Sequence, residues 1–214
     1  MLETVAASKT QWRMDNSDVE ILARTQSYRG FLRVDEYKLR HRLFAGGWSP
    51  VLSREVMERG NAVAAALYDP IRDEVVLIEQ FRIGAHTAGE PPWMVEGVAG
   101  MLAKGADPIA VLRHEISEET GLEATAIERI GRAMASPGGT SECVEMYAAK
   151  VDARKAAGFH GLAHEGEDIR VFAEDFATAF ASFFDGRRLG SAFTIMCLQW
   201  LALNRERLRT HWRD

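Results

Sequence analysis

Three glutamates lie close together in one short stretch of the chain, and their spacing fits one side of a helix. Glu115, Glu118 and Glu119 are three and four residues apart, which on a helix separates their Cβ atoms by roughly 5–6 Å. Like charges at this spacing destabilise an isolated helix by about 0.2–0.5 kcal/mol per pair. Because a bound cation would reverse the sign of this interaction, the stretch indicates a site for a divalent metal ion.

The residues around these glutamates predict the helix that must carry them. Asp107 is a favourable N-cap and Pro108 suits the first helical turn, whereas Gly121 fits the position just after a helix end. An apolar stripe repeats between these limits, at Ile109, Leu112 and Ile116. The glutamates lie on the flank of that stripe, so the helix can pack on a core and still present its acids.

The stretch 100–122 resembles the Nudix box, the signature of hydrolases that act on nucleoside diphosphates linked to another moiety. The pattern is Gly, five residues, Glu, seven residues, then Arg-Glu-apolar-x-Glu-Glu-x-Gly-apolar. This chain matches it at Gly100, Glu115, Ile116, Glu118, Glu119, Gly121 and Leu122. It departs at Ala106, where the first Glu is expected, and at His114, where the Arg is expected. Ala106 cannot bind a metal, and His114 orients a glutamate less firmly than an arginine would.

The resemblance implies a metal site built from this helix and the strand before it. Its ligands would be Glu115, Glu119 and the backbone carbonyl of Ala99, with Glu118 as a further ligand or a carboxylate beside them. Oxygen ligands favour Mg²⁺, or Mn²⁺, over Zn²⁺. Divalent cations suit pyrophosphate hydrolysis because they screen the phosphate charge, polarise the phosphoryl oxygen and acidify water.

A second acidic segment, residues 164–168, has the sequence HEGED. Nearly the whole chain resembles the ADP-ribose pyrophosphatase branch of the Nudix family, in which a loop of this form supplies a catalytic carboxylate and one more metal ligand. The resemblance therefore implies that Glu165 is the base or orients the attacking water and that Glu167 binds metal. We count Glu165 and Glu118 as the catalytic residues. Without the resemblance, the segment is a polar surface loop.

The same resemblance implies five substrate-binding residues: Phe31, Arg54, Arg82, Ser136 and Glu142. Arg82 ends an apolar strand, and its guanidinium suits a phosphate. Phe31 and Arg54 match positions that sandwich the adenine, partly from the other subunit. Ser136 begins the segment SPGGTSE, and Glu142 matches a contact to the terminal ribose. Apart from the resemblance, Phe31 also fits a strand core, Arg54 a solvated strand charge, and SPGG a turn.

The elements that must position these residues fall into two parts. Residues 1–58 contain three strand-like segments and predict a small β-rich subdomain, which would be marginal alone. Residues 59–214 predict a Nudix domain with several strands and three helices. The resemblance implies an α/β/α sandwich for this part, and a homodimer in which the amino-terminal sheet is exchanged between subunits.

The composition narrows the partners and the compartment. A net charge of −5 argues against non-specific binding to nucleic acid or to an anionic membrane surface. No stretch of 18 apolar residues and no signal-peptide core is present. The two cysteines, Cys143 and Cys197, provide no disulfide framework. We therefore expect a cytoplasmic protein with a small-molecule substrate.

These observations favour one activity and leave two alternatives. The resemblance implies Mg²⁺-dependent hydrolysis of ADP-ribose to AMP and ribose 5-phosphate. Another nucleoside-diphosphate sugar, such as GDP-mannose, is the alternative within enzymes. A nucleotide-binding module with little catalysis is the alternative from another class, kept open by Ala106 and His114.

Overall fold

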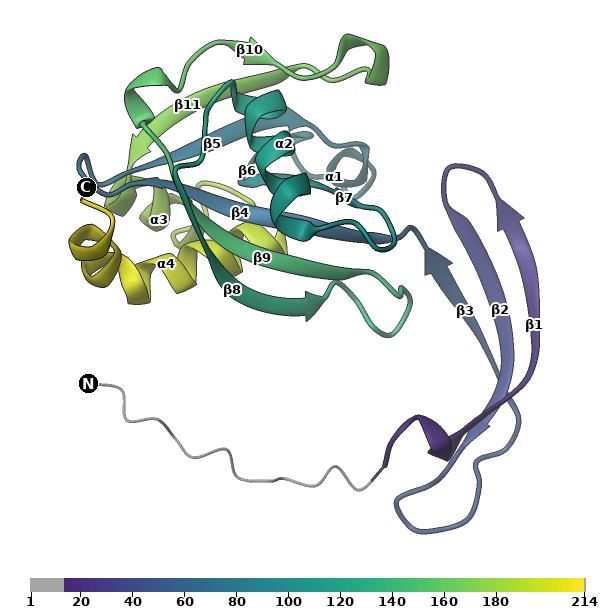
Figure 1. Ribbon diagram of the computed structural model, residues 1–214. Coiled ribbons are helices and arrows are strands. Elements are labelled where there is room, and N and C mark those ends of the chain that lie inside the picture. The colour runs from purple at the N-terminus through teal and green to yellow at the C-terminus, as the bar shows by residue number, and fades with distance from the viewer. Residues whose placement is uncertain (1–13, 214) are drawn as a thin grey trace. The chain divides into compact units, whose positions relative to one another are not determined.

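The computed structural model describes residues 14–213, and the chain divides into two compact units (Figure 1). Unit 1 contains the described residues up to Arg59 together with Gly138–Thr140. Unit 2 contains Gly60–Pro137 and the residues from Ser141 onward. No helix in the described part of the chain is long and apolar enough to cross a membrane.

Unit 1 is an antiparallel sheet with a polar interior. It consists of the short helix η1 (Asn16–Asp18) and the strands β1 (Val19–Arg29), β2 (Arg33–His41) and β3 (Leu52–Glu58), in the order β1-β2-β3. The 138–140 segment joins it through Met57, whose N–H donates to the Gly139 carbonyl at 2.8 Å. Within residues 14–59, the buried side chains are Asp35 and Ser49, and no apolar side chain is buried.

Unit 2 is built on an eight-stranded mixed sheet. Its main path runs β10-β11-β5-β4-β9-β8, while β6 pairs with β5 and β7 with β4. The β4–β9 pair is parallel and the other pairs are antiparallel. The strands are β4 (Asn61–Asp69), β5 (Glu74–Phe81), β6 (Trp93–Glu96), β7 (Val98–Leu102), β8 (Ala126–Met134), β9 (Cys143–Lys150), β10 (Phe159–His160) and β11 (Ile169–Asp175).

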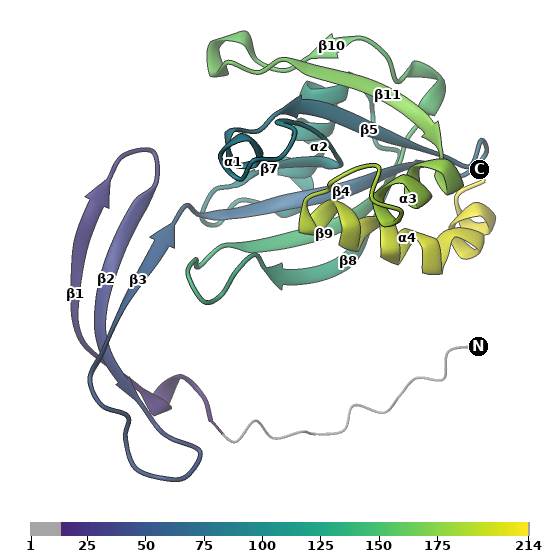
Figure 2. The ribbon, with the colours of Figure 1, turned by 180° about the vertical axis from the view of Figure 1, so that it is seen from behind.

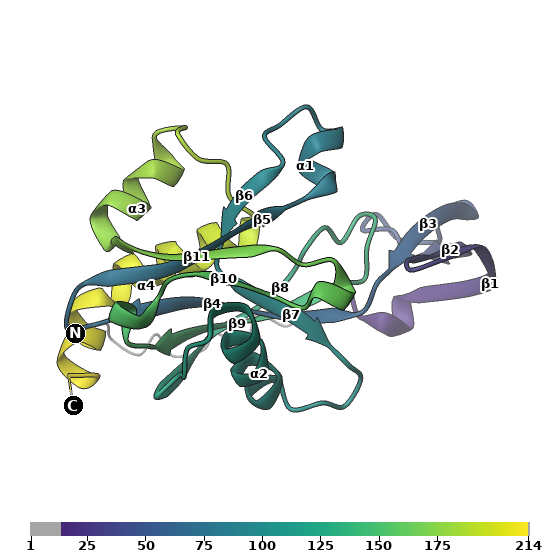
Figure 3. The same ribbon diagram turned by 90° about the horizontal axis from the view of Figure 1, so that it is seen from above.

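Helices cover both faces of this sheet, which confirms the expected α/β/α sandwich. Helix α2 (Pro108–Thr120) lies on one face, and α3 (Phe176–Phe184) and α4 (Ala192–His211) lie on the other (Figures 2 and 3). The shorter helices are α1 (Ile83–Thr87), η2 (Ala153–Lys155) and η3 (Ala163–Glu165).

Alternation along the strands produces a separate hydrophobic core on each face. Val63, Ala65 and Leu67 of β4 face α2 and pack with its Leu112 and Ile116. The intervening residues of β4 face the opposite side, where they pack with α3 and α4. The central strands are therefore buried on both faces, as the continuous apolar sequence of β4 and β5 predicts.

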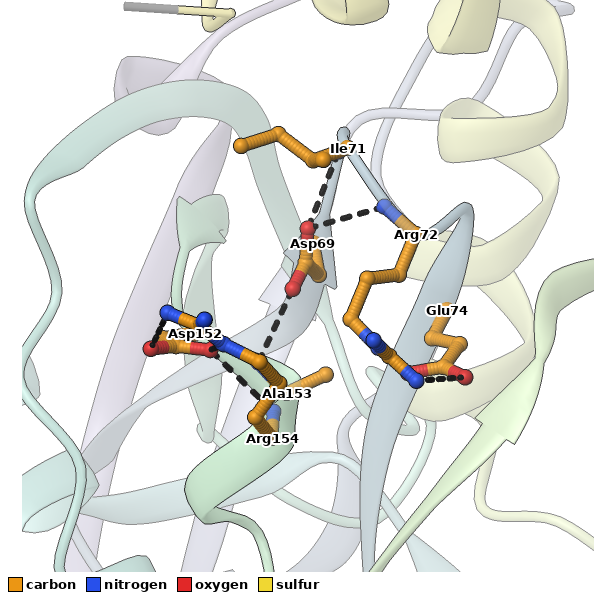
Figure 4. A network of polar contacts seen from close by, with 7 residues as sticks. All are labelled: Asp69, Ile71, Arg72, Glu74, Asp152, Ala153 and Arg154. Atoms are coloured by element: carbon orange, nitrogen blue, oxygen red, sulfur yellow. Dashed lines mark hydrogen bonds and ion pairs between the residues drawn. The ribbon is translucent and has the colours of Figure 1, made fainter.

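A buried aspartate fixes the end of the sheet at the β4–β5 turn. Asp69 Oδ1 accepts hydrogen bonds from the backbone N–H groups of Ile71 and Arg72, at 2.9 and 3.1 Å (Figure 4). Its Oδ2 accepts from the N–H of Ala153 at 3.1 Å. One carboxylate thus ties the hairpin to the segment that follows β9. The ion pairs Arg72–Glu74 and Arg154–Asp152 flank it.

After the strand end at Arg82, residues 83–87 form helix α1. Gly97 separates β6 from β7. The expected apolar stripe of α2 was wrong at one position. Ile109 is 41% exposed, so the buried stripe of α2 consists of Leu112 and Ile116.

Gly97 provides a test of packing between β7 and β4. A Cβ atom at this position would lie 2.5 Å from the Ala65 carbonyl oxygen. Because that oxygen belongs to a central strand, we expect Gly97→Ala to destabilise the fold by about 1–3 kcal/mol, measured by urea denaturation. Gly84→Ala, which meets no atom within 4 Å, is the matched control. Equal stabilities for the two variants would contradict this packing.

Candidate active site

Helix α2 holds its glutamates against the sheet because two residues of its apolar side are fully buried. Leu112 and Ile116 are 0% exposed. The helix begins at the predicted N-cap, where Asp107 Oδ1 accepts from the Ile109 N–H at 3.2 Å, and ends at Gly121 with a φ of 66°. Local capping and core burial therefore fix both the rotation and the length of the helix.

Gly100 of β7 makes room for Glu115. It pairs with Val63, whose side chain faces α2, so Gly100 presents its backbone to the same helix. A Cβ atom at Gly100 would overlap the carboxyl group of Glu115. Glycine thus lets this carboxylate lie directly over the strand.

Glu119 lies deeper and contacts the neighbouring residue of the same strand. Its side chain is 4% exposed, and its Oε2 accepts a long hydrogen bond, 3.4 Å, from the Ala99 N–H. Ala99 and Gly100 therefore contact the two glutamates that the sequence predicts as metal ligands.

Burial and mutual repulsion favour the protonated forms of both carboxyls. Desolvation, followed by the charge of Glu118, raises the pKa of Glu115 to about 7. Desolvation, followed by the charge of Glu115, raises the pKa of Glu119 to about 8. The surroundings of Glu115 and Glu119 contain too little positive charge to stabilise two ionised carboxylates. A bound cation would provide that charge.

The β10–β11 hairpin brings a second set of carboxylates to the same region. Glu165 ends η3 and is exposed, while Glu167 is half-buried and its Oε2 accepts from the Leu162 N–H at 3.0 Å. The negative charges of Glu167 and Glu165 both raise the pKa of Glu115. Residues some 50 positions apart in the sequence therefore act on one another electrostatically.

Arg82 lies near this cluster and is held by a residue that the sequence analysis missed. Its positive charge lowers the pKa of Glu119. Its Nε donates to Glu96 Oε2 at 2.8 Å, and its backbone N–H donates to the Pro92 carbonyl at 2.7 Å. Glu96 pairs with Ile78 across β5 and β6, so it faces α2. The signal was a glutamate in an otherwise apolar segment, WMVEGV.

The departures from the Nudix pattern leave a weak local contact. His114 Nδ1 lies 3.7 Å from Glu118 Oε2, and the histidine side chain is 73% exposed. This distance is longer than a hydrogen bond. Ala106 precedes the N-cap and provides no polar side chain. Glu118 is thus less tightly oriented than a guanidinium would make it.

The other predicted substrate contacts lie in two different places. Ser136 and Glu142 belong to unit 2 and lie near the two ends of the β8–β9 loop. These ends are joined by a 3.1 Å hydrogen bond from the Ala135 N–H to the Glu142 carbonyl. Phe31, at the β1–β2 turn, and Arg54, on β3, belong to unit 1. Phe31 is 88% exposed, so it is not a strand-core residue.

The donor set fits a hard divalent cation. Glu115, Glu119 and Glu167 offer only oxygen atoms. Glu119 is buried, Glu115 is half-buried, and both have raised pKa values. Within residues 14–213, no three His, Cys, Asp or Glu side chains already form a complete metal-binding group.

The α/β/α sandwich and the acidic helix beside an arginine define a hydrolase of the Nudix type. A family model, the NUDIX domain, matches residues 58–182. The chain therefore belongs to the Nudix family.

Curated relatives extend the similarity beyond that domain. An ADP-ribose pyrophosphatase of Escherichia coli is 45% identical over 196 residues, covering 92% of this chain and 93% of the relative. An ADP-ribose pyrophosphatase of Haemophilus influenzae is 38% identical over 199 residues, covering 92% and 91%. A GDP-mannose pyrophosphatase of Cronobacter sakazakii is 36% identical over 151 residues, covering 70% and 78%.

A solved structure supports the fold. The crystal structure of an ADP compounds hydrolase is similar with a TM-score of 0.67 at 17% sequence identity. The similarity covers 92% of this chain and 97% of the other. At this identity the comparison concerns the fold alone.

Gly100→Ala tests the position of Glu115. The added methyl group would displace a flexible carboxyl group rather than the backbone, so we expect a folded protein whose affinity for Mn²⁺ falls about tenfold or more. Titration of free Mn²⁺ by electron paramagnetic resonance measures this affinity. Gly131→Ala, a strand glycine that meets no atom within 4 Å, should leave it unchanged. Normal Mn²⁺ binding by Gly100→Ala would argue against Glu115 as a ligand.

Proposed function

We propose that this protein hydrolyses the pyrophosphate of ADP-ribose to AMP and ribose 5-phosphate. The observation that carries this proposal is the 45% identity, over 92% of the chain, to a protein named ADP-ribose pyrophosphatase. The convergence of Glu115, Glu119, Glu165 and Glu167 near Arg82 supports it. The location proposed is the cytoplasm, and the two free thiols are in keeping with a reducing compartment.

Mg²⁺, with Mn²⁺ as a substitute, is the proposed cofactor. The ligands would be Glu115, Glu119, Glu167 and the carbonyl of Ala99, because these oxygens lie on α2, on β7 and in the β10–β11 hairpin. When bound, the cation would screen phosphate charge, polarise the phosphoryl oxygen and lower the pKa of water.

The protein side chains would divide the remaining work. Arg82, held at Nε by Glu96, would bind phosphate oxygens through its guanidinium. Glu165, which is exposed, would orient a water molecule and accept its proton. The water oxygen forms a bond to phosphorus while the bond from phosphorus to the bridging oxygen breaks. Glu118, counted with Glu165 as catalytic, would be a further cation ligand or a carboxylate beside the ligands.

GDP-mannose is the second candidate substrate. A GDP-mannose pyrophosphatase shares 36% identity over 151 residues, a shorter and weaker similarity than that to the ADP-ribose enzymes. The pyrophosphate chemistry would be the same, so the difference lies in recognition of the base and the sugar.

We expect the protein with Mg²⁺ to release AMP from ADP-ribose faster than GMP from GDP-mannose, measured by chromatography of the products. Glu119→Gln should lower kcat about a hundredfold, because it removes a proposed ligand. Glu123→Gln, on an exposed residue just beyond α2, is the control and should leave kcat unchanged.

The outcomes separate the alternatives. Turnover of GDP-mannose alone would contradict the adenine assignment. Tight binding of ADP-ribose without turnover would indicate a nucleotide-binding module. Full activity of Glu119→Gln would contradict the assigned metal site.

We also propose a homodimer in which residues 1–58 are an exchanged subdomain and residues 59–214 the Nudix domain. Support comes from the sheet of unit 1, which buries no apolar side chain among residues 14–59. A three-stranded sheet of this kind needs a packing partner. A second copy of the chain would provide one.

The register of unit 1 supports sharing of the adenine site between subunits. Phe31 lies two residues before Arg33, which pairs with Glu58, whereas Arg54 pairs with Tyr37. Four positions along β3 separate these points, about 13 Å. This separation favours, within the proposed dimer, a base held by Phe31 of one subunit and Arg54 of the other over a base held by both side chains of one sheet.

Arg54→Ala tests this role. Loss of one stacking surface should raise the KM for ADP-ribose about tenfold and change kcat much less. Steady-state kinetics measures both, and light scattering after gel filtration should give twice the chain mass of 23.8 kDa. Lys38→Ala, a substitution on the neighbouring strand, is the control. An unchanged KM would count against stacking, and a monomeric mass would contradict the exchange.

A further inference from the structure

His160 belongs to the hairpin that carries one group of carboxylates, and its ring lies against the end of the helix that carries the other group. Gly121 ends α2 two residues after Glu119. His160 ends β10, and Glu165 and Glu167 follow in the loop that leads to β11. A contact between His160 and Gly121 therefore links the end of α2, next to Glu119, to the start of the loop that carries Glu165 and Glu167.

The His160 ring packs against two glycines, Gly121 and Gly158. A Cβ atom on Gly121 would lie 2.8 Å from His160 Cε1, closer than Cβ atoms approach other atoms. A Cβ atom on Gly158 would lie 3.5 Å from Nε2. Both glycines have positive φ angles, 66° and 97°. The Nε2 atom lies 3.0 Å from the Ala157 carbonyl oxygen, an interaction that requires a proton on Nε2.

Contacts within the hairpin connect His160 to Glu167. His160 pairs with Ile169, which is fully buried, so the base of the loop is fixed to the core under α2. Beyond it, the Glu167 side chain lies against Gly161, where a Cβ atom would come within 2.7 Å of the Glu167 Cβ. The Leu162 N–H donates to Glu167 Oε2, and the Glu167 N–H donates to the Leu162 carbonyl at 3.2 Å. Two hydrogen bonds between Leu162 and Glu167 thus join the two sides of the loop.

From these contacts we propose that His160 is a positioning residue. Its ring packs against Gly121 and fixes the β10–β11 hairpin to the end of α2. This contact determines the positions of Glu165 and Glu167 relative to the glutamates of α2. Glycine at position 121 then has two roles, because it ends the helix and accepts the ring. The catalytic part of this inference rests on the proposed function, whereas the contact itself does not.

The test compares His160→Ala with His160→Phe. The alanine variant removes the ring, so we expect about tenfold lower kcat, about tenfold weaker Mn²⁺ binding and a smaller change in KM. Amide hydrogen exchange in residues 161–167 should become about tenfold faster. The phenylalanine variant keeps a ring on the two glycines and should recover most of the kcat and Mn²⁺ affinity.

A double-mutant cycle measures the contact directly. Gly121→Ala should lower Mn²⁺ affinity in the wild-type background, because its methyl group displaces the ring. In the His160→Ala background the methyl group has room, so the further loss should be smaller and only backbone strain remains. Strictly additive effects would overturn the contact.

The readouts keep this inference separate from the substrate assignment. If the wild-type protein does not hydrolyse ADP-ribose but His160→Ala loosens the hairpin and weakens Mn²⁺ binding, the substrate is wrong and the positioning role stands. If His160→Ala changes stability alone, with Mn²⁺ affinity and hairpin exchange unaltered, the positioning role is overturned.

Discussion

The closeness of like-charged carboxylates on α2 is the constraint on which the arrangement of unit 2 depends. Burial and mutual repulsion raise the pKa values of Glu115 and Glu119, so the folded chain without a cation bears an electrostatic cost. The apolar contacts of Leu112 and Ile116 under the same helix offset that cost. A second apolar core on the far face of the sheet, under α3 and α4, stabilises the strands from behind.

The two units respond differently to the need for a core. Unit 2 has two hydrophobic cores, one apolar cluster on each face of its sheet. Unit 1 instead surrounds the buried carboxylate of Asp35 with Arg24 and Arg33, an arrangement that contributes little net stability once desolvation is included. The unit with two apolar cores is thus the one that holds the carboxylates, and the unit without an apolar core carries the residues proposed to bind the base.

Local signals predicted the acidic helix, whereas strand pairing decided the features that the sequence did not reveal. Asp107 and Gly121 are adjacent to the helix they delimit, so α2 was found with its correct ends. Glu96 is 14 residues from Arg82, and only the β5–β6 register brings them together. Likewise, residues 138–140 join unit 1 through a bond to Met57, 83 residues from Thr140. No local pattern encodes either contact.

The departures at Ala106 and His114 change orientation more than charge. Relative to the Nudix pattern, the chain lacks one glutamate at position 106 and one arginine at position 114, so one acidic and one basic side chain are both absent. In the proposed metal site, attraction for a cation would still depend on Glu115, Glu118 and Glu119. What is lost is the fork of donors that would hold Glu118, which His114 approaches only to 3.7 Å from the solvent side. In the proposed site, the position of the β10–β11 hairpin would consequently matter more, because its carboxylates would complete a cluster in which Glu118 has only this long contact to His114.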